Sequence, residues 1–315
     1  MQIRNIAFSN CFLSAGSLNF FRDGYWYDDW FKVLVPGFKM IDKISFVAKT
    51  TTLNPRIGNM PLDKNFRPQE LKPECIKVYP FSGTILNAVG LSGPGAKVLF
   101  EADKWQKLTQ PFFISFMAVG LSQAERIDEM KGFVDLLSAY LDKFAVPIGL
   151  QINVSCPNAG HNTADLAREA IMFLEQAASL GIPIDLKVNT LVRTEVVREV
   201  QDSRLCDVLT ISNTIPYGTA GVNWEKLFHQ KQSPLQKFGG GGLSGKVILP
   251  LVLRKISELR SSGIILPFKG SGGILRASDV EAMKMAGANA VEIGSVLILR
   301  PWRAKGIIEK AESIF

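Results

Sequence analysis

The chain has 315 residues, 47% of them hydrophobic, and its 36 Lys and Arg against 29 Asp and Glu give a formal net charge of +7. No uncharged apolar run reaches the roughly 18 residues that a membrane helix needs, and the first residues lack a signal-peptide pattern. We therefore expect a cytoplasmic protein that does not bind a membrane. Because the basic residues form no stripe with interleaved aromatic side chains, we also expect no binding to a nucleic acid.

The cysteines exclude several kinds of site. Cys11, Cys75, Cys156 and Cys206 lie far apart in the sequence and form no C-x-x-C pair. Such spacing encodes no disulfide framework, zinc site or iron–sulfur site. We therefore expect reduced thiols and no bound metal.

Eight segments have the apolar, β-branched character of parallel strands, and amphipathic segments separate the later ones. The predicted strands cover residues 7–14, 44–50, 112–118, 147–154, 183–188, 206–212, 263–269 and 289–294, and the predicted helices include 124–143, 163–180 and 247–260. Eight such repeats favour an α/β fold of the closed (β/α)₈ TIM-barrel type over an open doubly wound sheet. No G-x-G-x-x-G motif follows the first strand, which argues against a Rossmann unit.

Two insertions interrupt the alternation of strands and helices. Residues 53–110 are rich in proline and glycine, which is typical of loops and small antiparallel strands. Residues 213–246 are too long for an ordinary connection and contain the run Gly239 to Gly242, which suits either a close approach of the backbone to a ligand or a flexible hinge. We expect one domain over residues 1–315, with the inserted region over the C-terminal face of the barrel.

Residues 20–31 are unusually aromatic. Their rings suit the barrel floor, a subunit interface or a wall of the pocket, and packing in the core or an interface is the favoured interpretation.

The end of the fourth predicted strand is rich in reactive and hydrogen-bonding groups. Cys156 follows this strand and is flanked by Asn153 and Asn158. The carboxyl ends of parallel strands are where α/β proteins bind ligands, although a buried structural thiol in an Asn-rich turn fits the same pattern. Lys49 and Lys187 also lie near predicted strand ends, and Lys187 has a possible ion-pair partner in Asp185, two positions away on the same strand face.

Two glycine turns follow the last two predicted strands. Gly270 to Gly273 follow the seventh strand, and Gly294 and Ser295 follow the eighth. In TIM barrels these loops often hold a phosphate on backbone N–H groups. The pair of turns predicts a phosphorylated cofactor.

A series of short motifs runs in one order along most of the chain. The motifs are Lys49-Thr50-Thr51-Thr52-Leu53 with Arg56, Gly58 and Asn59; Leu86 to Leu91; Asn153 to Asn158; Lys187; Ser212-Asn213-Thr214; Gly241 to Gly245; Gly272-Gly273-Ile274; and Ile293-Gly294-Ser295. In these motifs the chain resembles the dihydroorotate dehydrogenases, FMN-containing (β/α)₈ barrels of pyrimidine biosynthesis.

The resemblance implies roles for individual residues. Cys156 matches the catalytic base, which is Cys in the class 1 enzymes and Ser in the membrane-associated class 2 enzymes, and Lys49 matches a lysine between flavin and substrate. The implied substrate-binding residues are Lys49, Asn87, Val89, Gly90, Leu91, Asn153, Asn158, Asn213 and Thr214. The implied FMN-binding residues are Ala15, Gly16, Lys49, Thr50, Ser115, Asn153, Lys187, Ser212, Gly245, Gly272, Gly273, Gly294 and Ser295.

The implied reaction is the oxidation of dihydroorotate to orotate, in which Cys156 removes a proton and a hydride passes to FMN. A second hypothesis keeps the fold and cofactor but takes another dihydropyrimidine or dihydrouridine in tRNA as substrate. A third, a flavin-binding protein without turnover, is disfavoured by the intact Cys156 and the two lysines. The sequence does not distinguish among fumarate, an NAD-linked subunit and another electron acceptor, and class 1 relatives imply a homodimer.

Overall fold

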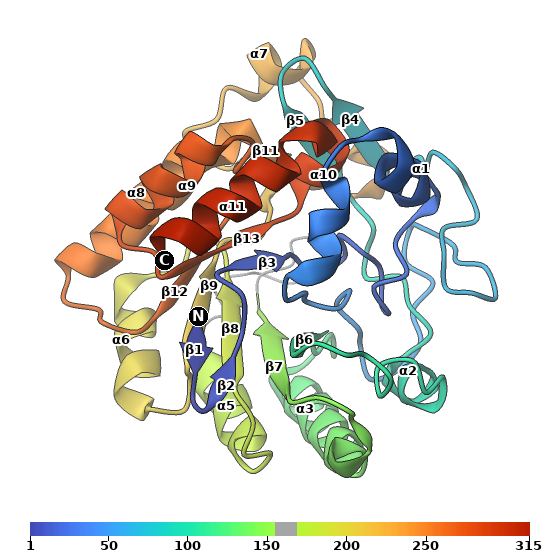
Figure 1. Ribbon diagram of the computed structural model, residues 1–315, viewed down its shortest axis with the longest axis vertical. Helices are drawn as coiled ribbons and strands as arrows, with labels where there is room; N and C mark the ends of the chain where they lie inside the picture. The colour runs from blue at the N-terminus through green and yellow to red at the C-terminus, as the bar shows by residue number, and fades with distance from the viewer. Residues whose placement is uncertain (155–168) are drawn as a thin grey trace.

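Parallel strands form the centre of the molecule (Figure 1). The computed structural model describes residues 1–154 and 169–315. Within them, seven parallel strands pair in the order β3-β13-β12-β9-β8-β7-β6. Their bounds are Cys11–Leu13 (β3), Phe112–Phe116 (β6), Ile148–Asn153 (β7), Ile184–Val188 (β8), Val208–Ile211 (β9), Phe268–Ser271 (β12) and Ala290–Ile293 (β13).

An extended segment between β3 and β6 closes the ring. Leu13 forms a parallel bridge with Phe46, and Val47 forms another with Phe113. The Val47 N–H donates to the Leu13 carbonyl at 2.9 Å, and the Ala48 N–H donates to the Phe113 carbonyl at 2.8 Å. The segment predicted as a strand at 44–50 thus takes the eighth position, and the expected (β/α)₈ barrel is confirmed.

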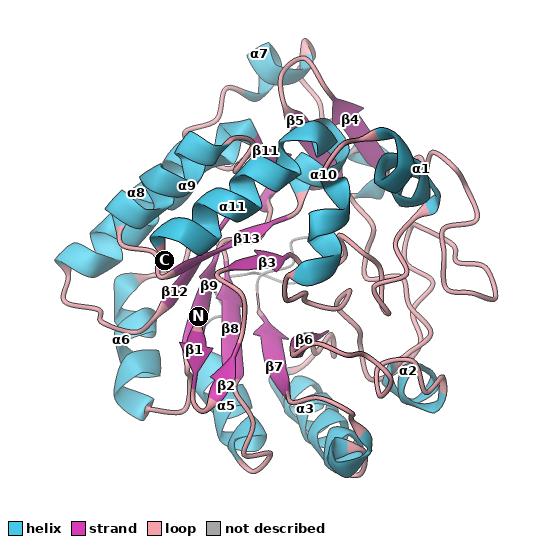
Figure 2. Ribbon diagram, viewed as in Figure 1, coloured by secondary structure: helices cyan, strands magenta, loops and turns pink. Residues whose placement is uncertain are grey.

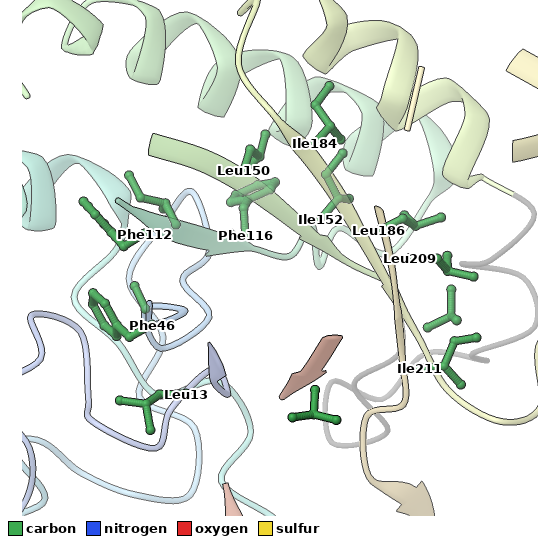
Figure 3. Packing of buried hydrophobic residues seen from close by; sticks show 14 of the residues in the cluster. Leu13, Phe46, Phe112, Phe116, Leu150, Ile152, Ile184, Leu186, Leu209 and Ile211 are labelled. Atoms are coloured by element: carbon green, nitrogen blue, oxygen red, sulfur yellow. The ribbon is translucent and has the colours of Figure 1, made fainter. Parts of the chain in front are cut away.

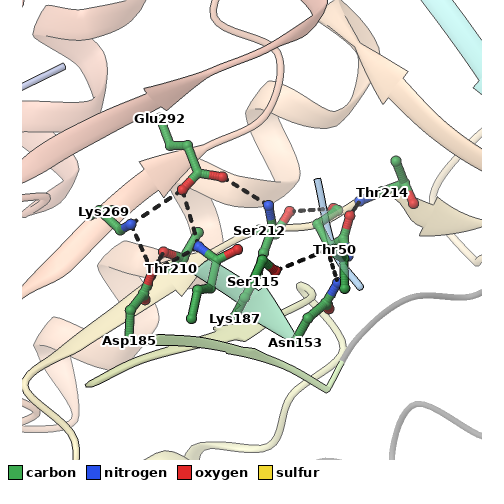
Figure 4. A network of polar contacts seen from close by, with 12 residues as sticks. Thr50, Ser115, Asn153, Asp185, Lys187, Thr210, Ser212, Thr214, Lys269 and Glu292 are labelled. Carbon is green, nitrogen blue, oxygen red and sulfur yellow. Dashed lines mark hydrogen bonds and ion pairs between the residues drawn. The ribbon is translucent and has the colours of Figure 1, made fainter. Parts of the chain in front are cut away.

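Side chains alternate along the barrel strands as a period of two residues requires. In β7, Leu150 and Ile152 point out of the barrel toward the helices (Figure 3), whereas Asn153 points inward (Figure 4). Gln151 also faces the interior, where its Nε2 donates to Asp185 and Glu292. Leu186 in the next strand packs in the same outer apolar cluster. The inward positions are therefore the ones available for polar groups.

One predicted strand was misplaced. Residues 263–269 were expected to form the seventh strand, but β12 begins at Phe268. Ile264 and Leu266 are buried in the connection that precedes it. Their apolar character therefore reflects burial beneath the neighbouring elements rather than strand pairing, which periodicity alone cannot distinguish in a short run.

Helices surround the strands (Figure 2). Within the described residues they are Trp26–Leu34 (α1), Ala96–Glu101 (α2), Gln123–Ser138 (α3), Ala170–Ala178 (α5), Thr194–Ser203 (α6), Trp224–Phe228 (α7), Leu249–Ser261 (α8), Ala277–Ala286 (α9), Ser295–Leu299 (α10) and Ala304–Ile314 (α11). The local sequence determines where α3 begins, through a capping box. The Ser122 side chain accepts a hydrogen bond from the Glu125 N–H, and the Glu125 carboxylate accepts one from the Ser122 N–H. Of the predicted helix 163–180, residues 163–168 lie outside the described residues. No helix in the described part of the chain is long and apolar enough to span a bilayer.

The two insertions meet in one antiparallel sheet, with the strand order β10-β11-β5-β4. Its strands are Ile76–Tyr79 (β4), Thr84–Asn87 (β5), Ile215–Pro216 (β10) and Gly242–Gly245 (β11). Gly245 has a φ of +98°, and a Cβ atom there would lie 2.2 Å from the Gly83 carbonyl oxygen. This glycine therefore allows one insertion to approach the other closely. The predicted small antiparallel strands are confirmed, and the expectation of one domain over the whole chain stays a prediction.

The amino-terminal hairpin covers the opposite end of the barrel. Strands β1 (Gln2–Ile3) and β2 (Ile6–Ala7) are antiparallel. Ile3 and Phe8 pack in one apolar cluster with Val208 and Ala290, the first residues of β9 and β13. The cluster seals the amino ends of the strands, so a ligand reaches the barrel interior from the carboxyl ends.

Gly149 offers a test of the packing inside the barrel. A Cβ atom at this buried position would lie 2.3 Å from Cε1 of Phe113. We expect Gly149→Ala to lower the free energy of unfolding by about 1–3 kcal/mol, because the ring must move in a packed interior. Urea denaturation followed by circular dichroism measures the change.

The matched control is Gly306→Ala in α11, where a Cβ atom would meet nothing within 4 Å. This substitution should raise stability by about 0.5–1 kcal/mol through helix propensity. Equal stability of the two variants would contradict the packing argument.

Candidate active site

A cavity of about 310 Å³ lies at the carboxyl ends of the barrel strands, beneath the antiparallel sheet. Asn153 and Ser271, the last residues of β7 and β12, line it from the barrel side, and Ile85 of β5 lines it from the sheet side. The predicted site residues that line the cavity are Ala15, Gly16, Lys49, Thr50, Asn87, Val89, Gly90, Leu91, Asn153, Lys187, Ser212, Asn213, Thr214, Gly272, Gly273, Gly294 and Ser295. Residues far apart in the sequence thus share one cavity.

Among the described residues, two predicted site residues do not line the cavity. Ser115 lies behind it, with its hydroxyl 2.9 Å from that of Thr50. Gly245 lies in the roof beside Gly273. Cys156 and Asn158 lie outside the described residues, so their assignments stay predictions from the sequence.

A connected polar cluster on one side of the cavity is formed by the side chains of Asn153, Asn213 and Thr50. The Asn213 Nδ2 donates to Asn153 Oδ1 at 3.2 Å, and the Asn153 Nδ2 donates to the Thr50 hydroxyl at 3.3 Å. Asn87 comes from the roof, where its Nδ2 donates to the Gly242 carbonyl at 3.4 Å. Each amide carries both a donor and an acceptor, so the cluster suits a ligand with alternating N–H and C=O groups.

Lys49 brings a cation to the same cavity. Its side chain is 7% exposed, and its Nζ lies 4.5 Å from the centre of the Phe20 ring. The ammonium group also donates to the Ser92 carbonyl. These contacts place the cation beside a ring face and a carbonyl oxygen at the edge of the cavity, where its positive charge would attract an anionic ligand.

Lys187 enters the cavity from β8 and forms an ion pair across the barrel (Figure 4). Its Nζ lies 2.8 Å from Glu292 Oε1. The alternative pairing with Asp185 is wrong, because Asp185 lies one layer deeper, where it pairs with Lys269 at 2.7 Å. Residues two apart share a strand face but stand in successive layers, so each lysine meets the carboxylate of another strand.

Glu292 was not predicted as a site residue, although it lines the cavity. Burial alone would raise the pKa of its carboxyl group, but the ammonium groups of Lys187 and Lys269 outweigh burial and leave the pKa below its usual value. Glu292 is therefore a carboxylate at neutral pH. The available signal was an acidic residue at an inward position of an otherwise apolar strand.

Two glycine turns form a cradle of backbone on another side of the cavity. A Cβ atom at Gly273, where φ is +79°, would lie 2.8 Å from the Leu249 nitrogen. At Gly294 a Cβ atom would lie 2.3 Å from the Ser14 hydroxyl oxygen. Glycine therefore lets both turns pack closely against neighbouring protein atoms. Both turns also line the cavity, where backbone without side chains suits a group such as a phosphate.

A family model described as dihydroorotate dehydrogenase matches residues 1–315. The chain belongs to the dihydroorotate dehydrogenase family. The family expected from the ordered motifs is therefore confirmed.

Similar proteins include catalytic subunits of dihydroorotate dehydrogenase B (NAD(+)). The subunit from Cutibacterium acnes is 28% identical over 277 residues, which cover 86% of this chain and 80% of that protein. The subunit from Bacillus pumilus is 26% identical over 277 residues, covering 86% of this chain and 79% of that protein. Among solved structures, the DHODH of Eimeria tenella in complex with ferulenol has a TM-score of 0.69 at 18% identity, covering 99% of this chain and 83% of that one. This last likeness supports the same fold.

The aromatic segment gives this member of the dihydroorotate dehydrogenase family one wall of its cavity. Phe20 and Phe21 are buried in the core, as the favoured interpretation expected. Tyr25, Trp26 and Tyr27 instead line the cavity, and the Tyr25 hydroxyl donates to the Gly16 carbonyl at 2.7 Å. The segment thus divides between core and pocket.

Asp28 supports this wall from below. Its side chain is 1% exposed, and Oδ2 accepts a hydrogen bond from the Tyr25 N–H at 2.8 Å. Burial raises the pKa of this carboxyl group to about 6.

Among the described residues, no group of three or more His, Cys, Asp or Glu side chains could hold a metal ion.

The raised pKa of Asp28 predicts a pH dependence of stability. Because the pKa lies above its unfolded value of about 3.9, the folded state binds this proton more tightly. The resulting stability is present below pH 4 and is lost as the pH rises through about 6. Asp28→Asn should therefore gain stability relative to wild type between pH 4 and 7, by up to about 3 kcal/mol.

Denaturation at several pH values measures this difference. The control is Asp29→Asn, at an exposed position of the same helix, which should show no such trend. A constant difference between Asp28→Asn and wild type across this pH range would contradict the assignment.

Proposed function

We propose that the protein oxidises dihydroorotate to orotate in pyrimidine biosynthesis, with FMN as its cofactor. One observation carries the proposal: Asn87, Asn153 and Asn213 share a cavity with Lys49 and a glycine cradle at the open end of the barrel. Membership in the dihydroorotate dehydrogenase family supports the same reaction. The family also supports a flavin in general, and the cradle argues for FMN in particular.

The residues of the cavity fit FMN. Gly272, Gly273, Gly294 and Ser295 would hold its phosphate on backbone N–H groups, and Lys187 would face the flavin ring. Glycines along the cavity wall carry no side chain that would separate the backbone from a phosphate. When bound, FMN accepts the hydride that leaves the substrate.

The same cavity fits an orotate-like acid. The amides of Asn87, Asn153 and Asn213 would pair with the imide edge of the pyrimidine ring, donor against acceptor. The Lys49 ammonium would face the negative charge of the ligand in a site largely removed from water. Dihydrouridine in tRNA lacks the carboxylate, so this cation favours the free acid.

Cys156 is our proposed general base. It follows β7, three residues after Asn153 in the sequence, and it lies outside the described residues. A thiol has an ordinary pKa of about 8.5, and its thiolate form can accept a proton near neutral pH. The base would take the C5 proton while the amides hold the ring in place.

The names of the relatives support an electron acceptor that uses NAD+ through a second subunit. We propose such a subunit as the partner of this chain, together with pairing of two copies. A cytoplasmic location is consistent with the lack of a membrane-spanning helix in the described residues.

Anaerobic titration of the purified protein with dihydroorotate tests the proposed function. We expect loss of the flavin absorbance with one equivalent of substrate, and FMN as the released chromophore in mass spectrometry. Reduction by an uncharged dihydropyrimidine alone would favour the second hypothesis. Release of FAD would contradict the assignment of the cradle to a terminal phosphate.

Replacing Cys156 by Ala should slow reduction of the flavin by at least about 100-fold, the effect typical of losing a positioned base. Orotate binding and flavin content should persist, because the amides and lysines remain. Cys156→Ser should have intermediate activity that rises with pH. Stopped-flow absorbance measures the rate of flavin reduction in the wild type and in both variants.

Cys206→Ala is the matched control. Its buried thiol donates to the Val208 carbonyl at 3.0 Å, away from the cavity, and its loss should leave the rate within a few-fold of wild type. A similar rate for Cys156→Ala would remove Cys156 from the mechanism.

A further inference from the structure

Glu292 lies where the cavity meets a layer of buried charges beneath it (Figure 4). Its Oε1 accepts a hydrogen bond from Lys187 at 2.8 Å on the cavity side. Its Oε2 accepts hydrogen bonds from Lys269 and Gln151, each at 3.3 Å, on the side of the barrel interior. The side chain is 0% exposed. Glu292 therefore links a lysine of the cavity to the interior of the barrel.

The chemistry of these contacts requires a carboxylate. Both carboxylate oxygens of Glu292 accept hydrogen bonds. An ionised carboxylate can do this because it carries two acceptor oxygens and no donor. A glutamine would turn its NH₂ group toward Lys187 or toward Lys269. Either orientation places a donor against an ammonium group.

The layer beneath Glu292 fixes its position. Asp185 lies 2.7 Å from Lys269 and accepts a hydrogen bond from the Thr210 hydroxyl at 2.8 Å. Lys269 also lies between two rings, with Nζ 4.4 Å from the centre of Phe12 and 4.8 Å from that of Phe113. Because Lys269 is held on all these sides, the carboxylate that it binds is held as well.

We infer that Glu292 is a positioning residue that holds the Lys187 ammonium at the cavity floor and offsets its charge, thereby lowering the midpoint potential of the bound flavin. This inference rests on the proposed flavin site. An unpaired cation beside the flavin would stabilise the anionic reduced form. The partnered cation stabilises it less, so the reduced flavin passes its electrons on more readily.

The test compares midpoint potentials of the purified holoproteins, measured by equilibration with reference dyes. Glu292→Gln should shift the ratio of reduced to oxidised flavin at least tenfold toward the reduced form, which is about 30 mV for a two-electron couple. The matched control is Asp185→Asn, which removes the same charge from the same network but does not line the cavity. It should shift the ratio less than threefold.

A double-mutant cycle with Lys187→Met tests whether Glu292 acts through Lys187. The double variant removes both charges of the pair, so its ratio should lie within threefold of the wild-type ratio. A tenfold shift of the double variant toward the reduced form would mean that Glu292 does not act by offsetting Lys187, and the inference would be wrong. An unchanged potential in the single variant, or an equal shift in Asp185→Asn, would also overturn the inference.

The unfolding free energies of the apoproteins distinguish a purely structural role of Glu292 from an effect on the flavin. Both Glu292→Gln and Asp185→Asn should lose stability, whereas only Glu292→Gln should move the potential. If Glu292→Gln does not fold, Lys187→Met still tests the inference. This variant leaves the Glu292 carboxylate without the cation of the cavity, so the ratio of reduced to oxidised flavin should shift at least tenfold toward the oxidised form. An unchanged ratio in that variant would mean that the pair does not act on the flavin. Wild-type protein that carries no flavin would instead contradict the proposed function.

Discussion

The barrel is organised around four charges that are removed from water. Lys187, Lys269, Asp185 and Glu292 are each at most 4% exposed, and an unpaired charge in such a place would cost several kcal/mol. Two ammonium groups and two carboxylates neutralise one another, and they come from β8, β12 and β13. These strands must therefore keep their register, because a shift of one residue would turn each charge toward the apolar outer layer.

Much of the fold could be predicted from the sequence because barrel strands are short apolar runs with distinct boundaries. The error at residues 263–269 shows the limit, since burial without pairing produces the same apolar run. Lys49, Asn153 and the glycine turns could be placed in one cavity because they lie at or near the ends of barrel strands, and these ends converge in a parallel barrel. The roles of Cys156 and Asn158 stay predictions from the sequence.

The features that the sequence did not reveal depend on contacts across the barrel. Lys187 and Asp185 are neighbours on one strand, and nothing in their spacing indicates that each pairs with a residue more than 80 positions away. The aromatic wall escaped prediction for a similar reason. Phe20 and Tyr27 belong to one aromatic run, but only the path of the chain after Gly24 separates the core rings from the cavity rings.

The segment that closes the barrel carries a consequence of its own. It is joined to its neighbours by isolated bridges rather than by a full ladder of strand pairs, yet it bears Lys49 and Thr50, which line the cavity. Local opening in native proteins starts where few backbone hydrogen bonds must break. We call the junction between this segment and its neighbouring strands the seam. A ligand held by Lys49 on this segment and by Asn153 on β7 would stabilise the closed seam. Ligand binding and closure of the barrel would then be thermodynamically linked, and an occupied cavity would slow the exchange of amide hydrogens along the seam.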